Sequence, residues 1–350
     1  MRIAYVTEYD AADIHQWSGL GYHIASCLES QGFTLDYIGS LRTPLAPRML
    51  WKAKRFQYWL QGRNYLQRRN LALGREYARQ IERHPALATA DLVFSPGSIP
   101  ISALDTSLPI VIWTDATFAG MVGFYPAYSN LCTESIAAGN QLEQAALARC
   151  RLALYSSEWA ARTAREHYPV DPGKLRVVPF GANLTRSYSR DEVAAFIRQR
   201  DRSTCKLLFL GVDWQRKGGD IALQVAAQLH ARGLPVELHV AGCVPPGLNP
   251  DFVHRYGFLT KSTPAGREAI DRLMRESHFL ILPTRSDATP LVLNEASAYG
   301  LPSLATNIGG VSSLIREGRN GFLFDPPAAI DRYVNAILTT WSRRDQYEAL

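Results

Sequence analysis

The stretch HFLILPTRSDATPLVLNEASAYGLPSLAT, residues 278–306, decides the fold class. Its two ends, HFLILPT and SLAT, are continuous apolar runs of strand length, and the segment LVLNEASAYG between them predicts a helix. Continuous apolar strands that alternate with helices are typical of a parallel sheet covered on both faces. The stretch therefore predicts a strand, helix, strand unit of an α/β protein.

The same alternation runs through the whole chain. Further strands are predicted in the first half at RIAYVT, FTLDYIG, DLVFSP, PIVIWT and RLALYSS, and after Lys206 at KLLFLGV, VELHVAG and GFLF. The two series predict two Rossmann-like, doubly wound domains that face each other across a cleft. Sheets of this kind bind ligands beyond the carboxyl ends of their strands.

The boundary between the domains is predicted within residues 181–205, a polar stretch that contains no run typical of a buried strand. The chain has 350 residues, which is long for one core and sufficient for two domains of about 150 residues each. We therefore expect a first domain at 1–183, a linker at 184–203 and a second domain at 204–335.

Composition and the absence of several motifs exclude several classes of protein. The chain is 47% apolar and 20% charged, which are globular values. The five cysteines have no CxxC spacing and the histidines no HExxH spacing, which argues against disulfides, zinc and other metals. Neither GxSxG nor the P-loop pattern occurs. With no leader and no run of eighteen apolar residues, we expect a cytoplasmic protein.

The net charge is +6, and much of it is local. Between Asp36 and Glu76 there is no acidic residue, and aromatic residues are interleaved with nine cations: Arg42, Arg48, Lys52, Lys54, Arg55, Arg63, Arg68, Arg69 and Arg75. A basic amphipathic helix with aromatic anchors predicts peripheral binding to an anionic membrane, here the inner membrane face. Alternatively, the aromatics pack on the first domain. Nucleic acid is a weaker interpretation, because no binding module accompanies the charge.

An anion site is predicted where KLLFLGV runs into DWQRKGGD and then into a helix. Arg216 and Lys217 lie at this junction, and helix amino termini offer free N–H groups to anions. Gly218 and Gly219 allow the backbone to approach a diphosphate closely. The alternative is a solvated basic turn that Asp220 caps.

Two carboxylates flank the start of the helix at LVLNEASAYG: Asp287 follows a strand, and Glu295 lies in the first or second helical turn. Carboxylates beside an anion site would repel a phosphate unless they face hydroxyl groups, from which they accept hydrogen bonds. A ligand with both phosphates and hydroxyls is a nucleotide sugar. The alternative is two surface acids with no shared ligand.

The first half of the chain offers weaker signals. Gly19, Leu20 and Gly21 precede or open a helix, but the pattern has Ile24 where a dinucleotide fingerprint needs its last glycine. This excludes a dehydrogenase of that type. Asp115 follows the strand PIVIWT, either as a catalytic group or as a turn acid, and Ser157 is predicted to cap a helix.

The segments LGVDWQRKGGDIAL, SDATPLVLNEASAYGLPSLATNIGGVSSLI and GRNGFLF resemble retaining glycosyltransferases of glycosyltransferase family 4, which have the GT-B fold. The resemblance covers nearly the whole chain and is strongest from Leu207 to Asp325. It implies an acceptor-side first domain, a nucleotide-sugar-binding second domain and, at 336–350, the start of a carboxyl-terminal crossover helix.

The resemblance also implies roles for single residues. Glu295 would bind the ribose, Arg216 and Lys217 the diphosphate, and Asp287 would lie near the donor sugar. Asp287 replaces the family's usual Glu and is one methylene shorter, which puts the donor sugar in doubt. The remaining implied positions are the glycine loop Gly19–Gly21, Asp115 near the sugar, N–H donors in the turn of Thr289, Pro290 and Leu291, and base-binding backbone at Phe258 and Leu259.

The expected activity is retaining, metal-independent hexosyl transfer from a nucleoside-diphosphate sugar to a hydroxyl of a glycan, a lipid-linked or a small-molecule acceptor. No cofactor is expected beyond this co-substrate. Two other interpretations remain open. One is another GT-B enzyme, an epimerase or a phosphorylase, and the other is a nucleotide-sugar binder without catalysis.

Overall fold

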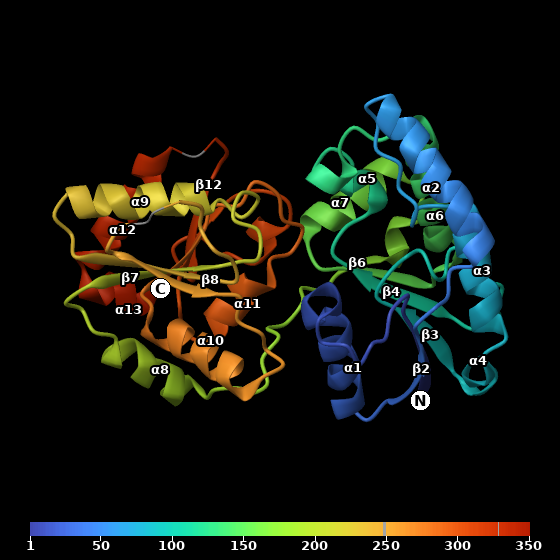
Figure 1. Cartoon of the computed structure of the whole chain (residues 1–350). Coiled ribbons are helices and arrows are strands. Elements are labelled where there is room, and N and C mark those ends of the chain that lie inside the picture. Colours follow the sequence, from blue (N-terminus) through green and yellow to red (C-terminus); the bar gives the residue numbers. More distant parts are fainter. Residues whose placement is uncertain (248–249, 328) are drawn as a thin grey trace. The chain divides into compact units, whose positions relative to one another are not determined.

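The computed structural model describes residues 1–247, 250–327 and 329–350, with only the backbone described at 45–47. The chain divides into two compact units, Met1–Pro179 and Phe180–Leu350. Each unit contains a six-stranded parallel sheet with helices packed around it (Figure 1). The predicted α/β class with two Rossmann-like sheets is confirmed.

The sheet of the first unit has the order β2-β1-β3-β4-β5-β6. Its strands are β1 (Arg2–Val6), β2 (Thr34–Ile38), β3 (Leu92–Ser95), β4 (Ile110–Thr114), β5 (Leu152–Tyr155) and β6 (Leu175–Val177). Its helices are α1 (Leu20–Ser30), α2 (Leu45–Leu60), α3 (Leu71–Glu82), α4 (Pro85–Thr89), α5 (Phe118–Met121), α6 (Thr133–Arg149) and α7 (Glu158–His167), with 3₁₀ turns at Gln16–Gly19, Pro126–Tyr128 and Pro172–Lys174.

The sheet of the second unit has the order β12-β11-β10-β7-β8-β9. Its strands are β7 (Cys205–Leu210), β8 (Val236–Ala241), β9 (Val253–Gly257), β10 (Phe279–Leu282), β11 (Ser303–Thr306) and β12 (Gly321–Phe324). Its helices are α8 (Arg190–Gln199), α9 (Gly219–Ala231), α10 (Pro264–Glu276), α11 (Leu291–Ala298), α12 (Ile330–Trp341) and α13 (Arg344–Ala349), with a 3₁₀ turn at Val311–Ser313.

Each of the predicted apolar runs contains a strand. The interior strands β10 and β11 are buried on both faces, whereas the edge strand β2 is largely exposed or only partly buried. Along β7, Leu207 and Phe209 pack against α9, whereas Leu208 joins the opposite cluster with Met274 and Leu293. β6 and β9 were not predicted; each is one of the two edge strands of its sheet. β6 is only three residues long and β9 reads VHRYG, so neither shows an apolar run.

The segment expected as a linker, 184–203, lies inside the second unit and contains α8. A capping box between Ser189 and Glu192 begins this helix. After α8, the buried Arg200 donates hydrogen bonds to the carbonyl oxygens of Gly300 (2.8 Å) and Tyr299 (3.0 Å). The polar composition of the segment reflects its exposure, since α8 has no fully buried residue, and the boundary between the units lies at residues 179/180.

The segment expected to begin a crossover helix, 336–350, contains the end of α12 and all of α13, and both belong to the second unit. The buried Tyr347 fixes α13. Its hydroxyl accepts a hydrogen bond from Arg200 (2.8 Å) and donates one to the carbonyl oxygen of His278 (3.1 Å).

In each sheet, successive strands are first placed toward one edge and later toward the other, so the strand order reverses once. In the second unit this switch point lies between the neighbouring parallel strands β7 and β10, and in the first between β1 and β3. The loops that follow β7 and β10 touch each other closely. Gly218 has a φ of 78°, and a Cβ there would overlap the carbonyl oxygen of Pro283. This contact therefore requires a glycine.

Gly218→Ala is expected to lower the free energy of unfolding by about 3 kcal/mol, because both the left-handed backbone and the overlap with Pro283 oppose a methyl group. Gly233→Ala is the matched control. Gly233 also has a positive φ, 83°, but a Cβ added there would meet no atom within 4 Å. Urea denaturation of both variants measures the difference, and equal losses would contradict the role of the Pro283 contact.

His278 is a buried histidine with a strongly lowered pKa. Its Nδ1 accepts a hydrogen bond from the Lys206 N–H (3.0 Å), which leaves the proton of the neutral ring on Nε2. Burial, with Arg200 and Lys206 nearby, lowers the pKa of His278 to about 3. The unfolded chain has the ordinary histidine pKa of about 6.5. Below that pH the unfolded state binds the additional proton, so stability is present above pH 6.5 and is lost as the pH falls.

We expect the folding equilibrium constant to fall about tenfold per pH unit between roughly pH 6 and pH 4 from this residue alone. His278→Asn keeps an acceptor for the Lys206 N–H but cannot titrate, so its stability should depend less on pH. Urea unfolding of both proteins across this range measures the two slopes. Parallel slopes would show that other groups cause the acid sensitivity.

Candidate functional site

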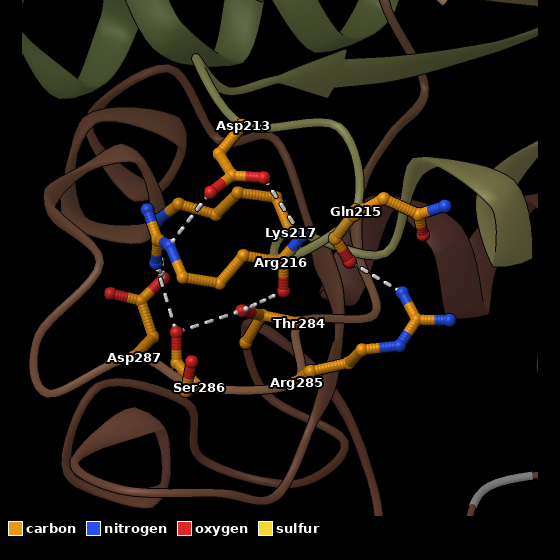
Figure 2. Close-up of polar contacts among 8 residues, drawn as sticks. All are labelled: Asp213, Gln215, Arg216, Lys217, Thr284, Arg285, Ser286 and Asp287. Carbon is orange, nitrogen blue, oxygen red and sulfur yellow. Dashed lines mark hydrogen bonds and ion pairs between the residues drawn. The ribbon is translucent and has the colours of Figure 1, made fainter. Parts of the chain in front are cut away.

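Two loops at the β7/β10 switch point bring Arg216, Lys217 and Asp287 together (Figure 2). The Lys217 ammonium forms an ion pair with Asp287 Oδ2, and Arg216 Nη1 lies 3.9 Å from the same oxygen. Arg216 Nη1 also donates to the carbonyl oxygen of Ser286 at 2.9 Å. These contacts join residues that lie 70 positions apart in the sequence. Three of the predicted catalytic residues therefore form one cluster.

The charges in this cluster are paired. Asp287 and Lys217 expose only 9% and 12% of their side chains, so their ion pair is largely removed from water. Arg216 is also paired with Asp213, with Nε and Oδ2 separated by 3.5 Å. A bound anion would therefore compete with Asp287 and Asp213 for the two cations.

Hydrogen bonds between the two loops hold the cluster in place. The carbonyl oxygen of Arg216 accepts from the Arg285 N–H (2.8 Å) and from Thr284 Oγ1 (3.1 Å). The Arg285 guanidinium binds both oxygens of Asp220, at 2.8 and 2.7 Å, and lowers the pKa of that carboxyl. The residue at the N-cap position of α9 is Gly218, and the Asp220 carboxylate accepts hydrogen bonds from the backbone N–H groups of Asp220 and Ile221 in the first turn.

Glu295 lies in the second turn of α11 and is 4% exposed. Its Oε1 forms an ion pair with Lys261, whose Nζ also lies 3.4 Å from the carbonyl oxygen of Asn183. Lys261 was not predicted as a site residue, because it is 34 residues from Glu295 and no sequence motif around it indicates a site. Asp287 and Glu295 thus each have their own lysine, and a ligand that binds Glu295 would meet Lys261 as well.

The predicted N–H donors before α11 need one correction. Pro290 has no N–H group, so only Thr289 and Leu291 of that turn can donate. Pro290 is the N-cap of α11, and its carbonyl oxygen accepts from the Leu293 N–H (3.0 Å). The predicted base-binding pair follows β9: Phe258 is 67% exposed, whereas Leu259 packs against the core.

The first unit has a pocket of about 200 Å³ at the carboxyl ends of β1, β3 and β4. Asp115 lines it directly after β4. The predicted glycine loop does not line this pocket but adjoins it. Gly19 is the left-handed N-cap of α1, Leu20 is buried, and Gly21 packs against the pocket residue Tyr9.

A buried charged group that the sequence analysis did not identify as a site residue lies at this pocket. Glu143 is 1% exposed; its Oε2 accepts from Ser98 Oγ at 2.7 Å and lies 3.6 Å from Arg69 Nη1. Burial raises the pKa of Glu143, and Arg69 opposes this rise. Glu8 itself lines the pocket, and burial raises its pKa while Arg69 opposes the rise. Arg69 therefore opposes the rise in pKa of both carboxyl groups.

Other expectations concern metals, thiols, capping and membrane spans. In the ranges that the structure describes, no group of three or more histidine, cysteine or acidic side chains has the arrangement of a metal site. All five cysteines are free. Ser157 caps α7 as predicted, accepting from the Ala160 N–H. None of the helices in these ranges has both the length and the apolar character needed to cross a membrane.

Comparison with known proteins gives the family of the second unit. Residues 204–343 match the family model described as glycosyl transferases group 1. The chain is 32% identical over 187 residues to the D-inositol 3-phosphate glycosyltransferase of Rhodococcus jostii (strain RHA1), covering 50% of this chain and 41% of that protein. It is 31% identical over 212 residues to the enzyme of the same name from Rhodococcus opacus (strain B4), covering 55% and 47%. The matches thus span less than half of these relatives.

Solved structures give the fold of the whole chain. Sucrose-phosphate synthase from Thermosynechococcus elongatus aligns with a TM-score of 0.70 and 15% identity, over 100% of this chain and 92% of that chain. WaaG, a glycosyltransferase involved in lipopolysaccharide biosynthesis, aligns with a TM-score of 0.62 and 16% identity, over 99% and 92%. Residues 204–343 are therefore similar to group 1 glycosyltransferases, and the chain has the GT-B fold.

Proposed function

We propose that this protein is a retaining glycosyltransferase that moves a sugar from a nucleoside-diphosphate sugar to an acceptor hydroxyl. The observation that carries the proposal is the cluster of Arg216, Lys217 and Asp287 at the β7/β10 switch point. Ligands of doubly wound sheets bind at this point. The match of residues 204–343 to group 1 glycosyltransferases supports the same activity.

In this proposal the donor lies over the second unit. Its diphosphate binds Arg216 and Lys217 beside the amino terminus of α9, and its ribose diol binds Glu295. HepE of Anabaena, whose structure was solved with UDP-glucose, aligns with this chain at a TM-score of 0.58. That likeness shows the fold alone. It makes UDP-sugars the first donors to test, followed by GDP- and ADP-sugars.

The proposed reaction occurs on one face of the sugar. The bond between the anomeric carbon and the diphosphate oxygen breaks, and its electron pair passes to the diphosphate. The acceptor oxygen bonds to the same carbon, and its proton passes to the departing phosphate oxygen. Arg216 and Lys217 stabilise the growing negative charge, a role that needs no metal ion. When the diphosphate binds Lys217, Asp287 loses this partner and becomes able to accept from a sugar hydroxyl.

The acceptor is proposed to bind in the first unit, where Asp115 lines the pocket beyond β1, β3 and β4. Hydroxyls suit a pocket that contains Glu8, Asp115 and Ser98, since carboxylates accept from hydroxyls and Ser98 can both donate and accept. The acceptor class remains a hydroxyl of a glycan, of a lipid-linked sugar or of a small molecule.

Glu295→Gln should weaken donor binding at least tenfold, because a neutral amide accepts more weakly from the ribose diol than a carboxylate. Lys261→Met is the matched control, since it removes the same ion pair but leaves the carboxylate. The measurement is calorimetric titration with UDP and the UDP-sugar that raises the melting temperature most. If both variants lose affinity equally, the ion pair itself supports the site and the ribose role of Glu295 is wrong.

Transfer should keep the anomeric configuration of the donor and should continue in excess EDTA. NMR of the first product formed, before mutarotation or further reaction, reports the configuration. An inverted product would contradict same-face transfer, and full loss of turnover in EDTA, restored by Mg²⁺, would contradict charge stabilisation by Arg216 and Lys217 alone. Turnover of the donor without any acceptor would instead favour an epimerase.

A further inference from the structure

Helix α2 (Leu45–Leu60) exposes an unusual amount of apolar surface, and Figure 1 shows it along the outside of the first unit. Five large apolar side chains on this helix are more than half exposed: Met49 (69%), Leu50 (58%), Phe56 (61%), Trp59 (67%) and Leu60 (66%). Phe56 and Trp59 stack on each other with ring centroids 6.0 Å apart. Contiguous exposed patches of this kind mark surfaces that bind something else.

The helix does not need this outer face to stay folded on the first unit. A separate stripe at positions 51, 54 and 58 faces inward: Trp51 is 5% exposed, Lys54 pairs with Glu134, and the Tyr58 hydroxyl donates to Glu134 (3.2 Å). Trp51 and Tyr58 pack in one cluster with the buried Tyr65. The prediction that the aromatic residues pack on the first domain is thus confirmed for this inner face.

The outer face is also strongly basic. Arg48, Lys52 and Arg55 are exposed, and none has an ion pair among the described residues. No acid occurs between Asp36 and Glu76, so no neighbouring acid in the sequence balances them. Lys52 and Arg55 line a shallow pocket together with Phe56, Trp59 and Gln67. This pocket combines cations for a phosphate with aromatic rings for the adjoining apolar groups.

We propose that the outer face of α2 binds the surface of an anionic membrane, with the helix lying parallel to that surface. Met49, Phe56, Trp59 and Leu60 enter the boundary between headgroups and acyl chains, and Arg48, Lys52 and Arg55 contact lipid phosphates. A nucleic acid would satisfy the cations but would leave the exposed leucine and methionine side chains in water. This surface is independent of the nucleotide-sugar chemistry and therefore goes beyond the proposed function.

The test is co-sedimentation of the full chain with vesicles at low salt. Mixed phosphatidylglycerol and phosphatidylcholine vesicles should bind the protein, and pure phosphatidylcholine vesicles should bind it much less. High salt should release the protein, because it screens the charges. Equal binding to both kinds of vesicle, or binding to neither, would overturn the proposal.

Two variants test the two parts of the surface. Replacing Arg48, Lys52 and Arg55 with Gln should weaken binding about a hundredfold, from about fivefold per cation. The matched control replaces Arg151, Arg162 and Arg165, exposed cations elsewhere on the same unit, and should bind more tightly than this variant. The double variant Phe56→Ser and Trp59→Ser keeps every cation and should also bind at least tenfold more weakly. Unchanged binding of that double variant would contradict insertion.

Circular dichroism checks that each variant folds, and the melting-temperature shift with UDP reports the proposed donor site separately. Vesicle binding without any melting-temperature shift on addition of nucleotides would support the membrane proposal and reject the donor proposal. The reverse result would reject only the membrane surface.

Discussion

The reversal of strand order between β7 and β10 is the constraint on which the second unit depends. The connections that leave these two neighbouring strands run in opposite directions along the sheet. No crossover helix therefore covers the crevice at their carboxyl ends. The two loops at these ends must then satisfy their own polar groups. They do so through the hydrogen bonds that the Arg216 carbonyl oxygen accepts, and the loops also approach each other closely at Gly218 and Pro283. The charged cluster follows from this crossing.

The paired charges give the unliganded cluster a property that composition alone does not reveal. Lys217 and Asp287 neutralise each other in a largely buried position, which avoids the large penalty of a lone buried charge. Glu295 and Lys261 repeat the arrangement. Each acid thus stabilises a cation before any ligand arrives. A phosphate that binds Lys217 would replace Asp287 as the anionic partner of the lysine. The affinity for the phosphate therefore depends on the difference between the free energies of these two ion pairs.

The sequence predicted the interior strands, the switch-point cluster and the helix that contains Glu295, because each leaves a local pattern. Continuous apolar runs mark strands buried on both faces, and Arg216, Lys217 and Asp287 directly follow two of them. The pattern fails for the edge strands β6 and β9, which have no apolar run, whereas the edge strands β2 and β12 were predicted. It also fails for Lys261 with Glu295 and for Arg69 with Glu143, which are 34 and 74 residues apart. Arg200 looked like part of a linker because its carbonyl partners are also distant in sequence.

The network around Arg200 links α13 to the end of α11, the helix that contains Glu295. Arg200 binds the Tyr347 hydroxyl from α13 and the carbonyl groups of Tyr299 and Gly300, which directly follow the helix of Glu295. Shortening the chain after Trp341 would remove Tyr347 and leave a buried guanidinium with one partner fewer. An engineer who trims this end, or fuses a bulky tag that displaces α13, would therefore disturb the support of the helix that contains Glu295 without changing Glu295 itself.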